Sequence, residues 1–452
     1  MLRFTMTLQE QEMSSSTSAE VADNKPRSRS QRTISVGENN NQVNRKASTH
    51  QDQGERKLIG IDGKWYDITT FIPHHPGGDI IKHFIGRDAT AVFHSFHERD
   101  VLKHRKPVGD FELDEDPATE AFRQLQKFFI ENGYFETSML WYAGKFAITF
   151  CLLALSFLCV IASEKWYVHY LGAFFLASFW HQCGFFMHDF MHTQGFHKAK
   201  IDRWLGTFFG TVCLGVSGSW WREEHFSHHA LTNTVNPETK WSDPQAHEAI
   251  FAQNERLFPL HNSLFEYYAI KVQHITFLPT CILFGRVAII LDSFREEKNV
   301  REWVAFVIHW TWICLLLSFL PSWYECLVFY SMAAIFEGVL HIQLLISHYC
   351  KPFYLENDIC TTQNWYRMQV ISNINIVNPV WMDWFHGGLN FHIEHHLFPL
   401  MPRHNYRKAN KHVKHVCKEL GITFDECTWS EAVIRTIQHL KKMSTHFSLN
   451  PN

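Results

Sequence analysis

Hydrophobic and polar residues are distributed unevenly along this chain of 452 residues. Residues 1–55 are almost all polar or charged, and are rich in Ser, Asn and Gln. Such a segment lacks the apolar side chains that a core requires, so we expect a disordered tail. The middle third of the chain, by contrast, is dense in Phe, Trp, Leu and Ile. This density indicates membrane-embedded or deeply buried helices.

Four stretches of the apolar region are long enough to cross a bilayer, which takes about 20 apolar residues in a helix. Charged residues or tryptophans lie at their ends, as is typical of the membrane–water interface. Within each successive pair, the connection is only a few residues long, so we expect two helical hairpins. The predicted spans are 144–163, 168–187, 303–320 and 323–347.

Two other apolar stretches, 204–218 and 264–291, are interrupted by Gly, Pro, Lys or His, so we expect interfacial or buried helices that do not span. Each of the two predicted hairpins crosses the membrane and returns the chain to the side from which it started. The connection 188–302 and the tail from residue 348 carry many Lys and Arg, which favours the cytosolic side. Because the N-terminal region has no signal-peptide pattern, we expect both termini in the cytosol.

The segment 56–113 has the composition of a small globular domain and contains no cysteine. Within it, Asp62-Gly63 between two short apolar segments predicts a β-hairpin. Residues 114–140 open with an acidic stretch and continue as an amphipathic helix. We interpret them as a linker to a membrane domain at 141–445.

Two histidines of the segment 56–113 are candidates for holding a planar cofactor. His75 precedes Pro-Gly-Gly, and the glycines allow a close approach of the backbone. With His97 on the opposite side, two neutral imidazoles would fill both axial positions of a haem iron and leave none for oxygen. His94 is a competing candidate for the second position.

This segment resembles cytochrome b5. The matching residues are the His-Pro-Gly-Gly at 75–78, the sequence GRDAT at 86–90 and the closing VGDFEL at 108–113. The resemblance implies a small α+β fold with a haem b whose axial ligands are His75 and His97.

Histidines recur at helical spacing in three places further along the chain. The spacing i, i+3, i+4 puts imidazoles on one face of a helix, within reach of a common point. No cysteine lies inside the clusters, so the donors are nitrogens, which suits iron or zinc better than calcium or a soft metal. The eight histidines are more than one metal ion can use. They are His188 and His192, then His225, His228 and His229, and finally His392, His395 and His396.

Residues near the clusters can complete such a site. His348, at the cytosolic end of the last predicted span, is the best-placed ninth ligand. Acidic side chains beside the clusters can orient the ligand rings by hydrogen bonds. The candidates for this role are Asp189 and Glu394, with Glu224 and Asp383 also nearby.

Composition and charge exclude several classes of protein. A net charge of −3 gives no reason to expect a nucleic-acid partner. All eleven cysteines follow residue 150 at irregular spacings, which indicates reduced thiols rather than a disulfide framework. A membrane zinc hydrolase is an alternative, because His-Asp-x-x-His at 188–192 is superficially similar to H-E-x-x-H with Asp189 as the base. It leaves the other histidine clusters and the haem segment unexplained.

Residues 180–405 resemble the membrane fatty acyl desaturases, and 57–445 resemble the front-end branch of that family, which carries a fused cytochrome b5. The family motifs H-x3-H and H-x2-H-H match the first two histidine clusters. In the third motif, Q-x2-H-H, the usual Gln is replaced here by His392, which keeps a nitrogen ligand.

The resemblance implies a di-iron centre that uses O2 to remove two hydrogens from adjacent methylenes of a long acyl chain. It also implies electrons relayed through the haem from an NADH-dependent cytochrome b5 reductase, and a location in the endoplasmic reticulum membrane. The predicted architecture is a small α+β cytochrome b5-like domain fused to an all-α polytopic membrane domain. That domain would have about four transmembrane helices and a cytosolic, histidine-rich di-iron cap.

The predicted substrate is a long-chain, (poly)unsaturated fatty acyl chain. The segments 339–348 and 381–391 are as similar to the Δ8 sphingolipid desaturases as to the Δ5/Δ6 fatty acyl enzymes. A sphingolipid long-chain base is therefore the alternative substrate. An acyl hydroxylase or acetylenase is a more distant alternative, because it would use the same metal ligands on the same scaffold.

Overall fold

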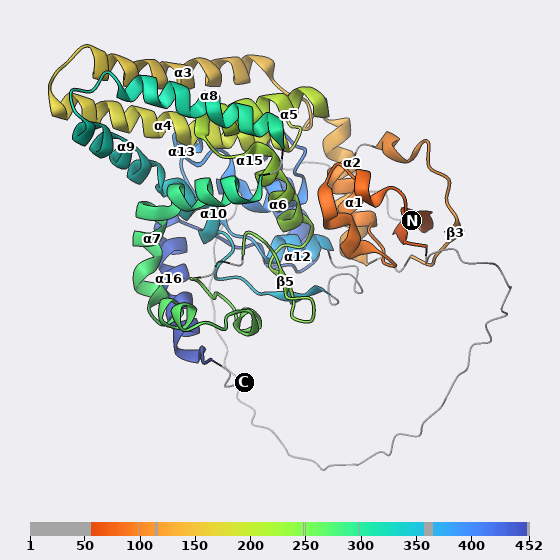
Figure 1. Ribbon diagram of the computed structural model, residues 1–452. Helices are drawn as coiled ribbons and strands as arrows, with labels where there is room; N and C mark the ends of the chain where they lie inside the picture. The colour runs from red at the N-terminus through yellow and green to blue at the C-terminus, as the bar shows by residue number, and fades with distance from the viewer. Residues whose placement is uncertain are drawn as a thin grey trace, which may run out of the picture. The chain divides into compact units, whose positions relative to one another are not determined.

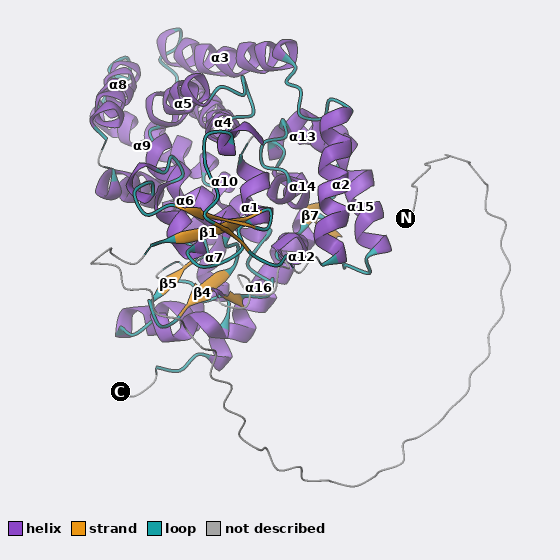
Figure 2. Cartoon of the chain, turned by 90° about the vertical axis from the view of Figure 1, so that its right-hand side faces the viewer, coloured by secondary structure: helices purple, strands orange, loops and turns teal. Residues whose placement is uncertain are grey.

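The structure is a computed structural model that describes residues 56–97, 99–113, 116–246, 248, 250–297, 299–356 and 365–449 (Figure 1). The tail predicted at 1–55 lies outside the described residues. Helices dominate the described part, and short strands form small sheets between them (Figure 2).

The hairpin predicted at Asp62-Gly63 is present. Strands β1 and β2 pair antiparallel, and the turn residues Asp62 and Gly63 have φ of 50° and 75°, as a two-residue type I′ turn requires. Strand β3 pairs with β2, and Ile61 packs in one core with Phe93. The elements are β1 (Leu58–Ile61), β2 (Lys64–Asp67), η1 (Ile72–His74), η2 (Gly78–Phe84), α1 (Thr90–Phe96), η3 (Arg99–Leu102) and β3 (Gly109–Asp110).

The amphipathic helix predicted in the linker is α2 (Pro117–Glu131). Its buried side chains recur every three or four residues, so one face of the helix packs against α12 (Trp365–Ile371) and α15 (Tyr406–Glu419). These side chains are Ala118, Phe122, Leu125 and Phe129.

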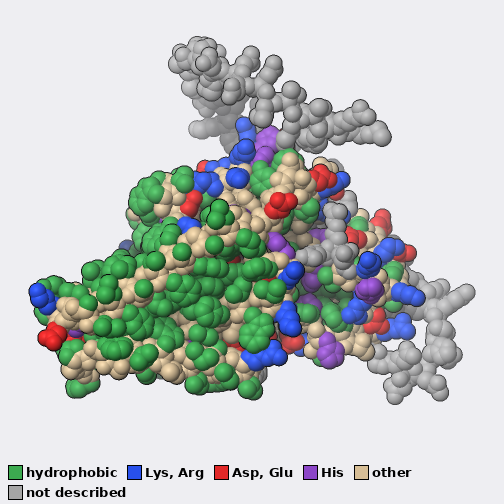
Figure 3. Space-filling view, turned by 90° about the horizontal axis from the view of Figure 1, so that it is seen from above, with side chains coloured by type: hydrophobic (Ala, Val, Ile, Leu, Met, Phe, Trp, Pro, Cys, Tyr) green, Lys and Arg blue, Asp and Glu red, His purple; other side chains and the backbone are tan. Residues whose placement is uncertain are grey.

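Four helices among the described residues are long and apolar enough to cross a membrane. Many of their exposed side chains are apolar, and Figure 3 shows a broad apolar surface over the long helices at the top of Figure 1, with charged side chains at its margins. The four are α3 (Met139–Ile161), α7 (Leu264–Glu296), α8 (Val300–Leu317), and Trp323–Ile346, which comprises α9 (Trp323–Glu337) and α10 (Val339–Ile346).

Three of these four helices overlap predicted spans, whereas α7 takes the place of the predicted span 168–187. The stretch 264–291, which we expected not to span, belongs to the continuous helix α7 of 33 residues. The predicted span 168–187 lies in α4 (Trp166–Met191). This helix is not among the four that are long and apolar enough to cross a membrane. Helix α4 packs against α3 and α9, so protein surrounds much of it and polar residues such as His181 are buried there.

Most of the remaining elements lie to the right of and below α3, α4 and α8 in Figure 1, and α6 and α14 among them carry the second and third histidine clusters. The stretch 204–218 forms the end of α5, a π-helix and the start of α6. The helices are α5 (Ala199–Thr207), η4 (Phe208–Leu214), α6 (Gly218–Ala230), η5 (Glu255–Leu260), η6 (Val380–Met382), α13 (Asp383–His386), η7 (Leu389–Phe391), α14 (His392–Leu397), η8 (Arg403–Asn405) and α16 (Trp429–His446). The strands are β4 (Thr234–Asn236), β5 (Trp241–Ser242), β6 (Tyr354–Leu355), β7 (Asn375–Ile376) and β8 (Glu426–Cys427).

The segment 56–113 is in direct contact with this histidine-bearing region. Glu356 accepts hydrogen bonds from Arg87 at 3.0 Å and from the His83 Nδ1 at 3.2 Å. On another side, Arg222 Nη1 donates to the Pro76 carbonyl at 2.7 Å. The small domain is therefore held against the rest of the chain by polar contacts in addition to its linker.

Replacing Glu356 with glutamine is expected to weaken this contact. Burial by itself would raise the pKa of Glu356, but hydrogen bonds from His83 and Asn236 and the charge of Arg87 lower it to about 2. At pH 7 we expect the free energy of unfolding to fall by roughly 1–3 kcal/mol, because the hydrogen bonds to an ionised group are lost. Thermal unfolding of the purified protein measures this difference.

The pH dependence of the difference follows from the lowered pKa. A lowered carboxyl pKa stabilises the folded chain fully above the ordinary value of 4.5, and this stabilisation disappears as the pH falls toward about 2. The difference between wild type and Glu356→Gln should therefore shrink over that range. The exposed Glu120, which accepts a hydrogen bond from Gln124, provides the control Glu120→Gln. An equal effect of both substitutions at pH 7 would contradict the prediction.

Candidate functional site

The structure brings all nine candidate metal-binding histidines into one buried cluster. Helix α4 ends in the first pair, α6 carries the second cluster, and α14 carries the third. The ninth, His348, follows α10 and faces the others, with its Nε2 2.9 Å from the Nε2 of His392. The nine are His188, His192, His225, His228, His229, His348, His392, His395 and His396.

Eight of these histidines form two groups of four. In each group, every residue offers one ring nitrogen, and these nitrogens all lie within 4.8 Å of one another. Helices α6 and α14 contribute to both groups, which places the two groups side by side. The first group is His188, His192, His225 and His395, and the second is His228, His348, His392 and His396.

His229 lies between the two groups. Its ring centroid is 4.5 Å from that of His225 in the first group and 4.1 Å from that of His396 in the second. Its Nε2 is 3.0 Å from the Nε2 of His225. His229 is thus close enough to contribute a ligand to either group. Its position in the sequence motif does not determine to which group it belongs.

The protonation state of the cluster suits a metal. Burial lowers the pKa of His229, His395 and His396 well below 6.5, and the neighbouring imidazoles lower it further. The rings are therefore neutral at pH 7, and neutral imidazole is the form that binds metals. Several buried ring nitrogens, including both of His192 and the Nε2 of His396, have no hydrogen-bond partner among the described residues. Converging, unpartnered nitrogens fit transition-metal ions such as iron or zinc.

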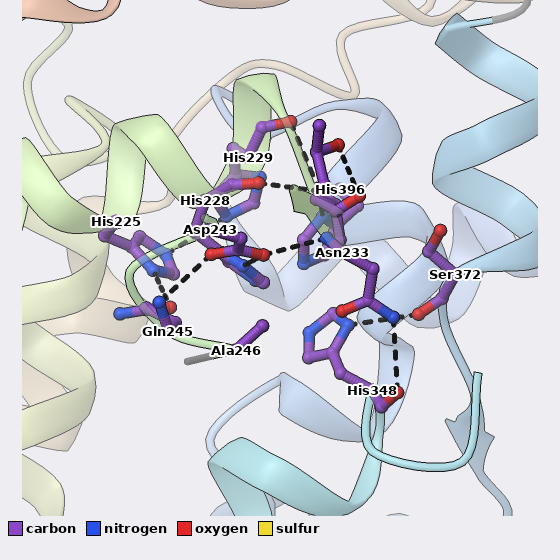
Figure 4. Close-up of polar contacts among 12 residues, drawn as sticks. His225, His228, His229, Asn233, Asp243, Gln245, Ala246, His348, Ser372 and His396 are labelled. Atoms are coloured by element: carbon purple, nitrogen blue, oxygen red, sulfur yellow. Dashed lines mark hydrogen bonds and ion pairs between the residues drawn. The ribbon is translucent and has the colours of Figure 1, made fainter. Parts of the chain in front are cut away.

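Outer partners orient five of the rings through Nδ1, which leaves Nε2 free to bind a metal. Figure 4 shows three of these contacts, those of His225, His228 and His348. The shortest of these contacts is the hydrogen bond that His228 Nδ1 donates to Asp243 at 2.7 Å. The others join His225 to Gln245 (2.9 Å), His396 to Gln369 (2.9 Å), His395 to the Tyr406 hydroxyl (3.0 Å) and His348 to the Ser372 carbonyl (3.1 Å).

Sequence reasoning missed these partners. It favoured acids adjacent to the histidines, but side chains of consecutive helical residues point about 100° apart, so a neighbour does not face the same point. Asp383, for example, pairs with Arg407 Nε at 2.8 Å. A local signal for Asp243 and Gln245 existed in the Asp-Pro-Gln at 243–245, which follows the second cluster.

The two predicted orienting acids lie in buried positions beside the cluster. Asp189 Oδ1 is 3.8 Å from His188 Nδ1, and its Oδ2 accepts a hydrogen bond from Tyr142 and lies 2.9 Å from Arg403 Nε. Glu394 accepts hydrogen bonds from two asparagine side chains, at 2.7 and 2.8 Å. A role for either acid in the chemistry stays a prediction.

Replacing Asp243 with asparagine is expected to lower metal affinity or activity roughly 10–100-fold, as loss of an outer partner typically does. The reason is that Asp243 holds both His228 Nδ1 and the Asn233 amide, at 2.7 and 2.8 Å. Metal content after dialysis against graded chelator measures the effect. Asp292→Asn, on the exposed side of α7, is the control, and equal metal retention in both variants would refute the assignment.

The haem candidates His75 and His97 face each other in the small domain. Their ring centroids lie 6.2 Å apart, which matches two imidazoles bonded at about 2 Å on opposite sides of one metal ion. Each Nδ1 donates to a backbone carbonyl, at 3.0 and 3.1 Å, so each Nε2 is free to bind. The competing candidate His94 instead contacts Asp62 through its Nε2 at 2.9 Å.

Burial and local packing also fit a cofactor between these rings. Burial lowers the pKa of His75 and lowers that of His97 to about 4, which keeps both imidazoles neutral. A Cβ at Gly77 would lie 2.7 Å from the His75 ring and would clash with it. Glycine at this position therefore allows the ring to keep its orientation. The residues present therefore fit a haem with two histidine ligands.

Comparison with known proteins agrees with both sites. The family described as "Fatty acid desaturase" matches residues 164–428, and the family described as "Cytochrome b5-like Heme/Steroid binding domain" matches residues 44–131. The first match alone covers more than half of the chain.

Curated relatives extend over most of the chain. Delta(8)-fatty-acid desaturase 1 of Arabidopsis thaliana is 28% identical over 88% of this chain and 92% of its own length. Acyl-lipid (9-3)-desaturase of Physcomitrium patens is 29% identical over 85% and 75%, respectively. Delta(6)-fatty-acid desaturase fat-3 of Caenorhabditis elegans is 28% identical over 85% and 96%. The predicted combination of a cytochrome b5-like domain with a largely helical membrane domain is confirmed, and this chain belongs to the fatty acid desaturase family.

Proposed function

We propose that this desaturase is a front-end enzyme. It would insert a double bond between an existing double bond and the carboxyl end of a long-chain (poly)unsaturated acyl chain, with O2 as co-substrate. The observation that carries the proposal is that one chain packs a domain with two facing histidines against a domain with two adjacent four-histidine groups. The relatives named for Δ6, Δ8 and (9-3) positions support the same reaction class.

The cluster would hold two iron ions. His188, His192, His225 and His395 would bind one ion, and His228, His348, His392 and His396 the other, with His229 between them. When bound, the iron pair supplies the activation of O2 and the removal of two hydrogens from the acyl chain. Asp243, Gln245, Gln369, Tyr406 and the Ser372 carbonyl would keep each Nε2 directed at its ion.

A small cavity of about 40 Å³ adjoins His188, with Arg286, Glu337 and His341 among its lining residues, and it has room for only a short part of the acyl chain. Its apolar walls include Phe185, Leu214, Leu340 and Leu389. These side chains would exclude water from the methylenes that lie next to the first histidine group.

Electrons would arrive through haem b held by His75 and His97, after reduction by an NADH-dependent cytochrome b5 reductase. The proposed location is the endoplasmic reticulum membrane, with both termini and all nine histidines on the cytosolic side. This arrangement requires that α4, which packs against α3, returns the chain across the membrane and that α7 does not span it. The proposed divisions are a tail at 1–55, a haem domain at 56–113, a linker at 114–140 and a membrane domain at 141–445.

A lipid profile of yeast cells expressing the full chain tests the function. Cells are fed separate polyunsaturated acids, and fatty acid methyl esters and sphingoid bases are analysed from the same culture. The expected result is an acid with a new double bond on the carboxyl side of an existing one, absent from cells expressing His395→Ala.

Other outcomes would replace the proposal. A new unsaturated long-chain base with unchanged fatty acids would show a sphingolipid desaturase. A hydroxylated or acetylenic acid would show the related chemistry on the same scaffold. Unchanged profiles in cells that contain the haem- and iron-loaded protein would refute desaturation of the acids supplied.

A further inference from the structure

Two phenylalanines lie between the haem pocket and the histidine cluster. Phe96, the last residue of α1, is directly followed by the candidate haem ligand His97. Its ring centroid is 5.3 Å from that of Phe226 on α6 and 6.1 Å from that of His229. Phe226 in turn lies 5.5 Å from His192. Two routes thus lead from His97 to the cluster after one peptide unit: the contact of Phe96 with His229, and the contacts of Phe96 with Phe226 and of Phe226 with His192.

The position of these rings is fixed from several directions. The guanidinium of Arg222 lies 4.4 Å from the centroid of the Phe226 ring. The same side chain donates to the Pro76 carbonyl, one residue after His75. Glu356 holds Arg87 on a further side of the small domain. The contact between the two sites is therefore built from two separate segments of the larger domain, α6 and the segment of Glu356, and does not rest on the linker alone.

We propose that Phe96 and Phe226 form the path by which electrons pass from the haem to the metal cluster. Electron tunnelling weakens steeply with distance, and more steeply across a gap than through packed atoms, so two rings in contact are a better path than loosely filled space. The inference rests on the proposed function, because it requires haem at His75 and His97 and iron at the nine histidines.

The path is used twice in each turnover. In each passage, one ferrous haem is oxidised to ferric haem and the metal centre gains one electron. With O2 and two protons from water, the two electrons and the two hydrogens of a –CH2–CH2– unit give –CH=CH– and two molecules of water. The reductase that receives electrons from NADH restores ferrous haem after each passage.

The test follows haem oxidation in the full-length protein, loaded with haem and iron and held in lipid nanodiscs. The haem is reduced, and its reoxidation is followed by stopped-flow absorbance after mixing with O2 and acyl substrate. Phe226→Leu and Phe96→Leu are expected to slow reoxidation several-fold, with unchanged haem absorbance, haem midpoint potential and iron content. Phe226→Tyr, which keeps the ring, should retain a rate close to wild type.

Phe128→Leu is the matched control. Phe128 is a half-buried phenylalanine on α2 that contacts Phe129, Tyr134 and His412 but neither histidine group. It should leave the rate unchanged. Wild-type reoxidation in a Phe96→Leu protein with both cofactors bound would overturn the proposal, and wild-type reoxidation in Phe226→Leu would remove Phe226 from the path and leave the contact of Phe96 with His229.

A second measurement separates this inference from the proposed function. Dithionite with small mediators reduces the metal centre directly, and a single turnover then needs no passage through the rings. Phe226→Leu should form as much unsaturated product as wild type under these conditions. Absence of product from wild type would refute the proposed function, whereas loss in Phe226→Leu alone would show that the ring supports the metal site and not the path.

Discussion

Substituting alanine for His395 is expected to abolish double-bond formation and lower the iron content, while the haem absorbance stays unchanged. His395 Nε2 lies 3.0 Å from His188 Nε2, and its ring centroid is 4.9 Å from that of His192. The substitution removes one of four nitrogens in the first group and leaves Tyr406 without its ring partner. The loss should exceed the roughly 10–100-fold effect of removing an outer partner.

Gas chromatography of the fatty acid methyl esters and elemental analysis of the purified protein measure both effects. His415→Ala is the control, because His415 is exposed and contacts Glu419 one helical turn away. It should match wild type in product and iron. Full iron content together with normal product formation in His395→Ala would mean that the first histidine group is not a metal site.

Alanine at His97 is expected to abolish haem binding and, with it, desaturation driven by NADH. The ring centroids of His75 and His97 lie 6.2 Å apart, and without His97 only His75 remains as a ligand. A haem bound by His75 alone would lack its second axial bond. Because His97 lies outside both four-histidine groups, the iron content should stay unchanged. The absorbance of the purified protein in its oxidised and reduced forms measures haem binding.

His94→Ala is the informative control for this prediction. His94 is three residues away, but its ring contacts Asp62 and does not face His75. The variant should bind haem normally. Loss of haem in His94→Ala with retention in His97→Ala would exchange the two assignments and contradict the geometry of the pocket.

The two variants separate the two halves of the reaction. His395→Ala should keep a reducible haem but form no product, and His97→Ala should keep the iron but receive no electrons. If the reduced metal centre is generated chemically, His97→Ala should regain a single turnover and His395→Ala should not. This contrast connects each site to its own step.

Local features of the sequence predicted much of the site. The spacing of His225, His228 and His229 places three rings on one turn of α6, because that geometry depends only on the helix itself. The positive φ of Asp62 and Gly63 follows equally from a two-residue turn.

The membrane helices were predicted less completely. Apolar composition identifies a helix that faces lipid, as for α3, whose exposed side chains are apolar. Apolar composition is a poorer guide to α4, because protein surrounds much of this helix. Its buried side chains include the polar residues His181 and His188. The stretch 264–291 was misjudged for a different reason: Pro279, Lys271 and His274 interrupt its apolar run, yet the helix continues through them.

The sequence by itself determined which side chains are candidates for the chemistry, because motif spacing and backbone turns are properties of a few neighbouring residues. Only the tertiary structure decided how they are combined. The division of eight histidines into two groups with His229 between them, the pairing of His228 with Asp243 and the contact of Phe96 with Phe226 join segments 15 to more than 200 residues apart. Such contacts depend on how whole helices pack against one another, and no local pattern of residues encodes that packing.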